Sequence, residues 1–298
     1  MNYRHAFHAG NFADVLKHIV LTRILLYLQE KPAAFRVIDT HAGAGRYDLT
    51  GDEAKRSGEW LTGIARVMQA RFSERALPLV APYLDIVRAF NEGAALAAYP
   101  GSPLIARALL RPQDRLTACE LEPNARKALI DALRRDSQAR VVDLDGWTAL
   151  TAFVPPNERR GLVLVDPPFE AKDEFERMAA GFREAFRKWP TGSYVLWYPV
   201  KSRRAADELA REVAQAAAAV LHVGLQQVHG GAVARVAAAH ERAIGRARRD
   251  EDAVAEPARV EEPRGPVRAT AGADLVAGDL DSSAGDERDR RGNRFGHR

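Results

Sequence analysis

The chain has 298 residues, of which 46% are hydrophobic and 28% are charged, proportions that are ordinary for a soluble globular protein. A formal net charge of +4 permits a polyanionic partner such as a nucleic acid without requiring one. The single cysteine, Cys119, excludes an intrachain disulfide and a metal site built from several cysteines. The chain shows neither a secretion-signal pattern nor the ~18 consecutive apolar residues of a membrane span, so we expect a cytoplasmic enzyme.

The first 95 residues predict a long helix, a short strand and a second helical region. Residues 11–31 carry a broad apolar face, with Asn11 suited to cap the start of the helix and Pro32 just past its end. The next segment, FRVIDTHAGAGRY, predicts a strand that runs into a glycine turn. Residues 49–95 are rich in helix-forming residues and lack a strand pattern, so we expect a helical insertion subdomain after the first strand.

Strand patterns then alternate with helical patterns. This alternation predicts an α/β fold with a parallel sheet that is covered on both faces. Ligands of such sheets bind at the carboxyl ends of the strands, so residues at those ends are the candidates for function. The expected strands lie near residues 116–123, 139–147, 161–168 and 193–200, and the main helices between them near 122–135 and 172–188.

The last quarter of the chain has a different composition. From about residue 226 onward it contains a single aromatic residue, Phe295, and no lysine. Ala, Arg, Gly, Asp and Glu dominate it, and such a segment cannot bury enough apolar surface to offset the entropy lost on ordering. We therefore expect the sheet to end near residue 224 and assign residues 225–298 to a low-complexity, disordered tail.

An acid and a glycine turn follow the first strand. Asp39 precedes Gly43-x-Gly45, and glycines at this place let the backbone approach a ligand closely, although ordinary tight turns also use them. A nicotinamide dinucleotide site is an alternative, but the third glycine of its fingerprint is missing and Asp48 stands there. An aspartate before the turn suits a ligand with a cationic amino-acid end better than a pyrophosphate.

Two further strands end in acids. Glu120 follows the second sheet strand, where a carboxylate can accept hydrogen bonds from both ribose hydroxyls of a nucleoside. Asp145 and Gly146 follow the third, where the carboxylate can face an adenine amino group. Each acid taken alone is equally consistent with a solvated loop, but acids or glycine turns at three successive strand ends favour a nucleoside-binding site.

The stretch LVLVDPPFE places an acid, two prolines and an aromatic ring at the end of a buried strand. The amine of an aromatic base is a poor nucleophile because its lone pair is delocalised into the ring, so a site that alkylates it needs acceptors for the N–H hydrogens. Asp166 supplies a carboxylate and Pro167 a carbonyl held in extended backbone. Phe169 offers a face for a flipped base. A tight strand-to-loop connection is the alternative reading.

These motifs together resemble a known enzyme family. DPPF matches the signature of amino-directed methyltransferases, and YRHAFHAGNFADVLKH, DTHAGAGRY, YPGSPLIARALLR, GLVLVDPPFE and LWYPV are similar to the bacterial 23S ribosomal RNA adenine-N6 methyltransferases of the RlmJ type. The resemblance covers roughly residues 1–224. It implies a Rossmann-like methyltransferase sheet, S-adenosyl-L-methionine as cofactor, and methylation of the N6 amine of one adenine in 23S ribosomal RNA.

The resemblance also implies roles for individual residues. Asp166 would be the catalytic acceptor, assisted by Pro167 and Phe169. The substrate entrance would lie near Tyr3, Arg4, Asn11 and Lys17. The cofactor would be held by His18, His41, Ser102, Glu120, Asp145, Gly146, Asp39 and Gly43. We expect residues 1–48 and 96–224 to form the catalytic domain of a monomer that needs no metal. A basic surface for RNA phosphates would include Arg4, Lys17, Arg46, Lys55 and Arg56.

The resemblance leaves alternatives open. The family continues past residue 224 with another strand, which this sequence is not expected to form, so translation in a shifted reading frame is one hypothesis for residues 225–298. An inactive RNA- or cofactor-binding remnant is then a second reading of the whole chain. A DNA adenine or a protein glutamine methyltransferase shares the DPPF motif, although the HAGNFADVLKH motif argues against both. A dinucleotide oxidoreductase is disfavoured by the glycine pattern.

Overall fold

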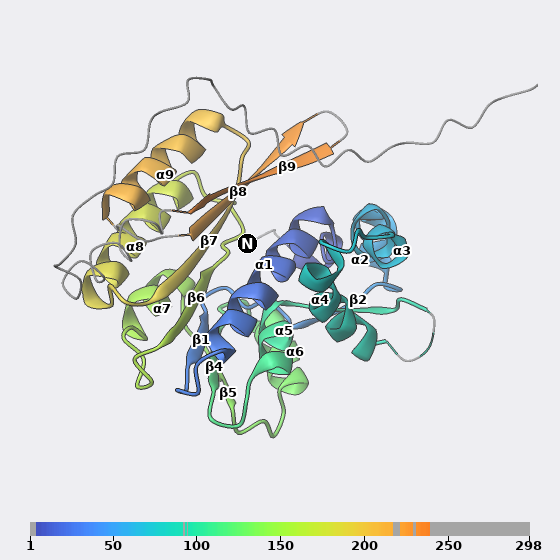
Figure 1. Ribbon diagram of the computed structural model, residues 1–298, viewed down its shortest axis with the longest axis horizontal. Helices are drawn as coiled ribbons and strands as arrows, with labels where there is room; N and C mark the ends of the chain where they lie inside the picture. Colours follow the sequence, from blue (N-terminus) through green and yellow to red (C-terminus); the bar gives the residue numbers. More distant parts are fainter. Residues whose placement is uncertain (1–3, 92, 94, 217–220, 229–230, 239–298) are drawn as a thin grey trace, which may run out of the picture. The chain divides into compact units, whose positions relative to one another are not determined.

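The computed structural model describes residues 4–91, 93, 95–216, 221–228 and 231–238. A seven-stranded sheet lies at its centre, with the strand order β5-β4-β1-β6-β7-β8-β9 (Figure 1). All neighbouring strands are parallel except the last pair, β8 and β9. The strands are β1 (Arg36–Asp39), β4 (Arg115–Cys119), β5 (Ala139–Val142), β6 (Gly161–Val165), β7 (Ser193–Pro199), β8 (Leu221–Val228) and β9 (Gly231–Ala238). The predicted α/β class with a mostly parallel sheet is confirmed.

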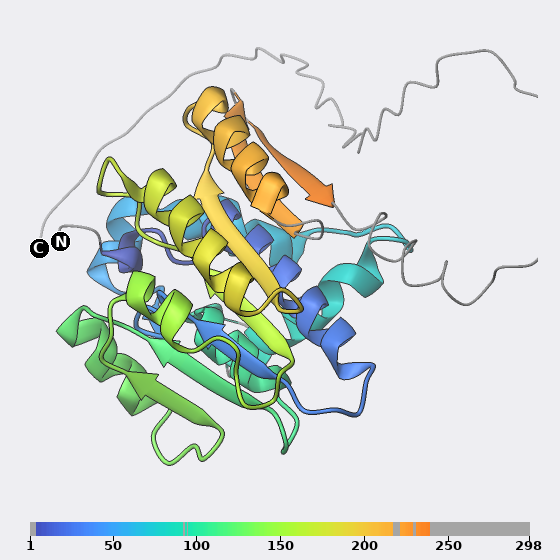
Figure 2. The same cartoon turned by 90° about the vertical axis from the view of Figure 1, so that its left-hand side faces the viewer.

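Helices cover both faces of this sheet because its strands are apolar on both sides. Along β1, Val37 belongs to one hydrophobic core and Ile38 to the other, as the alternation of side chains in a strand requires. One face carries α1 (Phe12–Gln29), α5 (Ser102–Leu109) and α6 (Pro123–Ala132). The other carries α7 (Gly146–Ala152), α8 (Glu174–Lys188) and α9 (Arg203–Ala216), which Figure 2 shows from their side.

The helices begin where the sequence supplies caps. Asn11 Oδ1 accepts a hydrogen bond from the backbone N–H of Asp14 at 2.9 Å and so starts α1. The Glu122 carboxylate caps α6, and Pro123 occupies its first turn. No helix within the described ranges is both long and apolar enough to cross a membrane.

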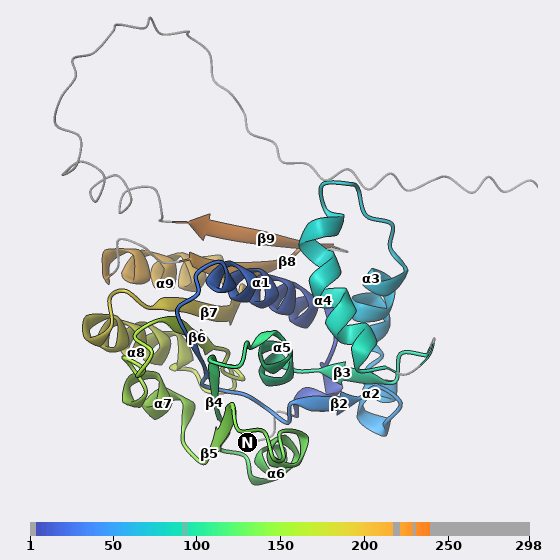
Figure 3. The same ribbon diagram turned by 60° about the horizontal axis from the view of Figure 1, so that its bottom comes forward.

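The chain between β1 and α5 leaves the sheet to form a separate group of elements (Figure 3). The short strands β2 (Arg46–Asp48) and β3 (Ala98–Pro100) pair antiparallel at its base. Between them lie α2 (Asp52–Ser57), a π turn (Leu61–Ala65), α3 (Arg66–Gln69) and α4 (Leu77–Ala89). We refer to residues 49–95 as the insertion. The elements described there are helical, and the division of the chain into a catalytic domain and an insertion subdomain stays a prediction.

The sheet continues beyond the point at which the sequence predicts its end. Strand β8 begins at Leu221, runs past residue 224 and pairs parallel with β7, and β9 pairs antiparallel with β8. The expectation that the chain forms no further strand is therefore wrong. The expectation is based on the average composition of residues 226–298. Within them the short stretch GAVARVAA is rich in valine and small apolar residues. The rest of the expected tail, residues 239–298, lies outside the described residues, as do residues 229–230.

Candidate active site

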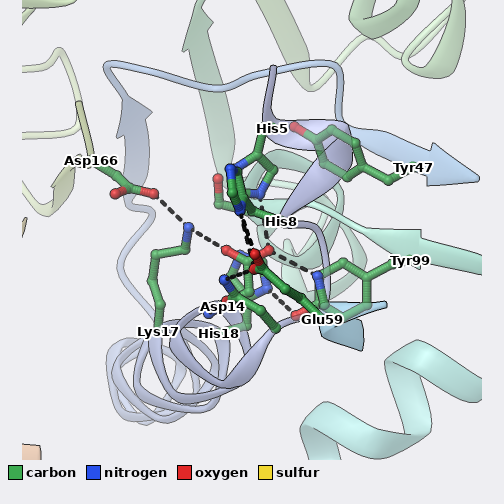
Figure 4. Close-up of polar contacts among 12 residues, drawn as sticks. His5, His8, Asp14, Lys17, His18, Tyr47, Glu59, Tyr99 and Asp166 are labelled. Atoms are coloured by element: carbon green, nitrogen blue, oxygen red, sulfur yellow. Dashed lines mark hydrogen bonds and ion pairs between the residues drawn. The ribbon is translucent and has the colours of Figure 1, made fainter. Parts of the chain in front are cut away.

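A buried lysine joins two acids at the carboxyl end of β6. Lys17 Nζ donates to Asp166 Oδ2 at 2.5 Å and to Asp14 Oδ1 at 2.9 Å (Figure 4). The Lys17 side chain is 5% exposed, against 21% for Asp166. Burial lowers the pKa of Lys17, but the carboxylates of Asp14 and Asp166 outweigh it and hold that pKa well above its usual range. Lys17 is therefore an ammonium ion that fixes one oxygen of Asp166.

Asp14 connects this pair to the beginning of the chain. Its Oδ2 accepts hydrogen bonds from the backbone N–H of Gly10 at 3.0 Å and from His5 Nε2 at 2.9 Å. Burial raises the pKa of Asp14, but His5 and Lys17 outweigh burial and hold it well below its usual range. Since an ionised carboxylate can only accept, His5 donates through Nε2. One anion thus holds the helix start and the N-terminal segment together.

The acid at the end of β1 is buried and partly unsatisfied. Ser102 Oγ donates to Asp39 Oδ2 at 2.7 Å, while Asp39 Oδ1 is buried with no hydrogen-bond partner in the described part of the chain. Burial raises the pKa of Asp39 to about 7, with the Ser102 hydrogen bond opposing the shift and the negative charge of Asp166 adding to it. The site would therefore gain from a ligand that donates hydrogen bonds or carries positive charge.

Glu120, after β4, is held by backbone amides. The N–H of Gly43 donates to its Oε2 at 2.7 Å, and the N–H of Glu122 donates to its Oε1 at 2.7 Å. Burial raises the pKa of Glu120, and these amides oppose the shift. Gly43 has φ +65°, and a Cβ there would lie 2.3 Å from the Tyr47 hydroxyl, so only glycine fits. The glycine turn after β1 and the end of β4 therefore meet at one carboxylate.

His41 and Gly146 are in close contact at the ends of β1 and β5. A Cβ on Gly146 would lie 2.4 Å from both His41 Nε2 and the Thr40 carbonyl oxygen. Burial lowers the pKa of His41 to about 4, so the ring is neutral at physiological pH. Because the Thr40 hydroxyl donates to Leu164 O, His41 Nδ1 donates to Thr40 Oγ1, at 2.8 Å. The lone pair on His41 Nε2 is thus left as an acceptor.

Asp145 has a structural role in the same place. Its Oδ2 accepts from the Thr148 N–H at 3.0 Å and thereby caps α7. One carboxylate oxygen of the predicted adenine contact is therefore committed to the helix.

The aromatic residue of DPPF adopts a conformation that is uncommon for a bulky side chain. Phe169 has φ +54°, in the left-handed region that costs a non-glycine residue of order 1–3 kcal/mol. Its ring lies 5.2 Å from that of Phe175, which in turn lies 5.9 Å from Tyr198 at the end of β7. These ring contacts pack Phe169 against the hydrophobic core.

His18, a predicted cofactor residue, is buried against two tyrosines. His18 is 1% exposed, and its Nδ1 lies 2.8 Å from the Tyr99 hydroxyl, with Tyr83 hydrogen-bonded to Tyr99 behind it. Burial lowers the pKa of His18 well below its usual value, and the neighbouring Lys17 adds to the shift. His18 Nε2 is buried without a partner in the described chain. Its predicted cofactor contact is not tested by these neighbours.

The predicted substrate residues are distributed between surface and interior. Arg4 is exposed and pairs with Glu53 at 2.5 Å. Asn11 caps α1, whereas Tyr3 lies outside the described residues. The expectation that Lys17 belongs to a basic surface is wrong, because its ammonium is buried between two carboxylates that keep it ionised.

Asp14 and His5 belong to the candidate site but were not predicted from the sequence. A signal for Asp14 was present, since Asp14 and Lys17 are spaced i, i+3 on the predicted helix and therefore lie on one face. The many apolar residues of that helix make the Asp14–Lys17 pair hard to recognise from the sequence.

Comparison with known proteins identifies a matching family and two similar proteins. A model of the family described as "Ribosomal RNA large subunit methyltransferase D, RlmJ" matches residues 32–241, which includes β8 and β9. The Escherichia coli (strain K12) protein named "Ribosomal RNA large subunit methyltransferase J" is 48% identical over 205 residues, covering 68% of this chain and 72% of that protein. The protein of the same name from Haemophilus influenzae is 42% identical over 206 residues, with the same coverage of both chains.

A solved structure supports the same assignment. The crystal structure of protein LPL1258 from Legionella pneumophila has a TM-score of 0.69 and 34% identity, and it covers 76% of this chain and 84% of that one. The resemblance seen in the sequence motifs is confirmed, and its end near residue 224 is corrected to residue 241. The chain belongs to the RlmJ family of ribosomal RNA large subunit methyltransferases.

Proposed function

We propose that the protein transfers a methyl group from S-adenosyl-L-methionine to the N6 amine of one adenine in 23S ribosomal RNA. The observation that carries this proposal is the Asp166 carboxylate at the end of β6, which the buried Lys17 ammonium holds directly before Pro167 and Phe169. The names of the Escherichia coli and Haemophilus influenzae relatives support a ribosomal RNA substrate.

The residues at the strand ends fit the proposed cofactor. Asp39 Oδ1 and His18 Nε2 are both buried and unpartnered within the described chain, as polar atoms that await a ligand would be. We assign Asp39 to the cationic amino-acid end of the cofactor and Glu120 to the ribose hydroxyls. The remaining contacts are assigned to His18, His41, Gly43, Ser102, Asp145 and Gly146. When bound, S-adenosyl-L-methionine supplies an electrophilic methyl group.

Asp166 orients the amine that receives the methyl group. Since Lys17 occupies Asp166 Oδ2, the other carboxylate oxygen and the Pro167 carbonyl are the acceptors for the two N–H hydrogens of an adenine amine. Both acceptors are fixed before the substrate arrives, one by an ion pair and one by the rigid prolines. The Phe169 ring supplies a face for the base. Catalysis then consists of positioning and of hydrogen-bond acceptance.

Basic residues beside this site suit an RNA partner. Arg46, Lys55 and Arg56 are exposed on β2 and α2, and Arg4 lies on the N-terminal segment. The guanidinium groups of Arg4 and Arg56 lie 6.0 Å and 5.3 Å from the centre of the Phe7 ring, which gathers them at one place. We propose that they hold RNA phosphates. Every residue assigned above belongs to one chain, so we propose that a monomer suffices.

Methyl transfer from labelled S-adenosyl-L-methionine to protein-free 23S ribosomal RNA tests the proposal. After digestion to nucleosides, the label should be found in N6-methyladenosine. Asp166→Asn should lower the rate at least ~100-fold. Asp143→Asn, a matched change of a 61% exposed acid after β5, should stay within about threefold of the unchanged protein. Label in DNA but not in RNA would identify a DNA methyltransferase instead, and binding of the cofactor without transfer to either would identify a remnant.

A further inference from the structure

The N-terminal segment, residues 4–11, is in direct contact with the insertion. The N–H of Ile64 in the π turn donates to Gly10 O at 2.8 Å. The neighbouring Gly63 leaves the helical region, with φ −95° and ψ −110°, and a Cβ on it would lie 2.1 Å from Gly10 O and 2.7 Å from Asn11 Cα. The two backbones therefore touch at a place where no side chain fits between them.

Glu59 lies beside this contact and holds two residues of the segment. His8 Nδ1 lies 3.0 Å from both carboxylate oxygens of Glu59, and Asn11 Nδ2 donates to Oε2 at 3.0 Å. The Glu59 and His8 side chains are each 39% exposed. A side-chain contact with this exposure stabilises a fold only weakly.

A series of hydrogen bonds that begins at Asn11 connects Glu59 to Asp166. Asn11 Nδ2 binds Glu59, while Oδ1 of the same side chain caps α1 by accepting from the Asp14 N–H. Asp14 accepts from Lys17, and Lys17 donates to Asp166. Each contact in this series lies between 2.5 and 3.0 Å, and Figure 4 shows Glu59, Asp14, Lys17 and Asp166 in this arrangement. The first turn of α1 thus takes its place from the insertion as well as from the sheet.

We propose that Glu59 is a positioning residue, which acts through the side-chain amide of Asn11 to place the start of α1, and with it Lys17, against Asp166. This inference rests on the proposed methyl transfer. Glu59 contacts His8 and Asn11, neither of which is assigned to the amine or the cofactor. Its loss should therefore slow the reaction without weakening cofactor binding.

Single-turnover methyl transfer at saturating cofactor and RNA tests this role. Glu59→Ala should lower the rate about tenfold or more, since small misplacements of reacting groups carry costs of this size. Glu59→Gln keeps an oxygen that accepts from Asn11 Nδ2 and should stay within about threefold. Glu74→Ala is the same change at an exposed position of the insertion and should leave the rate unchanged. Cofactor affinity should be equal in all four proteins.

A double-mutant cycle separates positioning from a general loss of structure. Asn11→Ser keeps a good helix cap but loses the amide that binds Glu59, so it should be as slow as Glu59→Ala. If Glu59 acts through Asn11, the double variant should be no slower than either single variant, within about twofold. Multiplied losses, a rate equal to that of the unchanged protein, or losses that follow the melting temperature would each overturn the inference. If the unchanged protein itself transfers no methyl group, the proposed function has failed instead.

Discussion

Lys17 Nζ and Asp166 Oδ2 lie 2.5 Å apart although 149 residues separate them in the chain. The contact joins the first turns of α1, a helix packed on one face of the sheet, to the end of strand β6 within the sheet. Asp14, from the same face of α1, accepts from the same ammonium. Residues from α1 and from the end of β6 thus form a cluster of two carboxylates and one ammonium ion.

Removal of the shared cation should affect both activity and stability. Lys17→Met leaves the buried Asp14 with His5 but without its ammonium partner, and loss of one partner of a buried ion pair typically costs about 3–5 kcal/mol. It also frees Asp166 to move, so methyl transfer should fall at least about 100-fold. Thermal unfolding and single-turnover transfer measure the two effects. Lys127→Met, at an exposed position of α6, is the control, and equal melting temperatures for both variants would contradict the burial argument.

Asp39 should lower the stability of the ligand-free protein as pH rises from 5 to 8, whereas the lowered pKa values of His18 and His41 make stability rise over the same range. The folded pKa of Asp39 is about 7, above the unfolded value near 3.8, so the folded state binds more protons between these values. The contribution of Asp39 is about 3 kcal/mol over this range. Chemical unfolding of the native chain and of Asp39→Asn at both pH values isolates it. Relative to the native chain, the asparagine variant should become more stable as pH rises from 5 to 8, and parallel pH profiles would show that Asp39 is ionised throughout.

Cofactor affinity should change in the opposite direction. The assigned ligand end is cationic, so it binds the ionised form of Asp39, and affinity should rise as pH increases through about 7. Calorimetric titration with S-adenosyl-L-methionine or its demethylated product between pH 6 and pH 8 measures the effect. Asp39→Asn should bind more weakly and show a flatter profile. An affinity that falls with pH would remove Asp39 from the cofactor site.

Gly146→Ala should disturb the contact between the ends of β1 and β5. The added methyl group would lie 2.4 Å from His41 Nε2 and from the Thr40 carbonyl, and backbone cannot move aside cheaply. Overpacking of this kind costs about 1–3 kcal/mol, and cofactor affinity should fall at least about tenfold. In Gly51→Ala the nearest atom would lie 3.4 Å away, so that variant should bind the cofactor normally. Equal affinities in the two variants would contradict the assignment of Gly146.

RNA binding should depend on salt through the basic residues of α2. Lys55→Ala should weaken binding to 23S ribosomal RNA and reduce the slope of log affinity against log salt by about one. Lys188→Ala makes the same change at an exposed position of α8, on the other face of the sheet, and should leave the slope unchanged. Filter binding at several salt concentrations provides both slopes. An equal decrease of the slope in both variants would indicate that RNA is attracted by the overall charge of the protein and not by the residues of α2.

The positions of three acids at the strand ends could be predicted from the sequence, whereas their roles stay predictions. Asp39, Glu120 and Asp166 follow apolar runs, and a parallel sheet brings such positions to one edge whatever the connections between them. The proline pair marked the end of β6 because it removes backbone donors. These predictions depended on local patterns alone.

The remaining parts depend on contacts between distant segments. Nothing local reveals that Lys17 is buried, because its environment is made by Asp166 and by Asp14 together. The role of Glu59 depends on the path of the π turn, which brings it to Asn11. Strand β9 was missed for a different reason, since its small apolar residues were averaged with the long polar segment that follows.

The strand order has a consequence for the synthesis of the protein. Strand β1 lies between β4 and β6, so the first strand to leave the ribosome acquires its second neighbour only after Val165 has been made. A nascent chain that stops before β6 has an open sheet edge at β1 and lacks Asp166, so Lys17 can pair only with Asp14. The catalytic centre is therefore a late product of folding, and truncated translation products of this chain should be inactive and prone to edge-to-edge association.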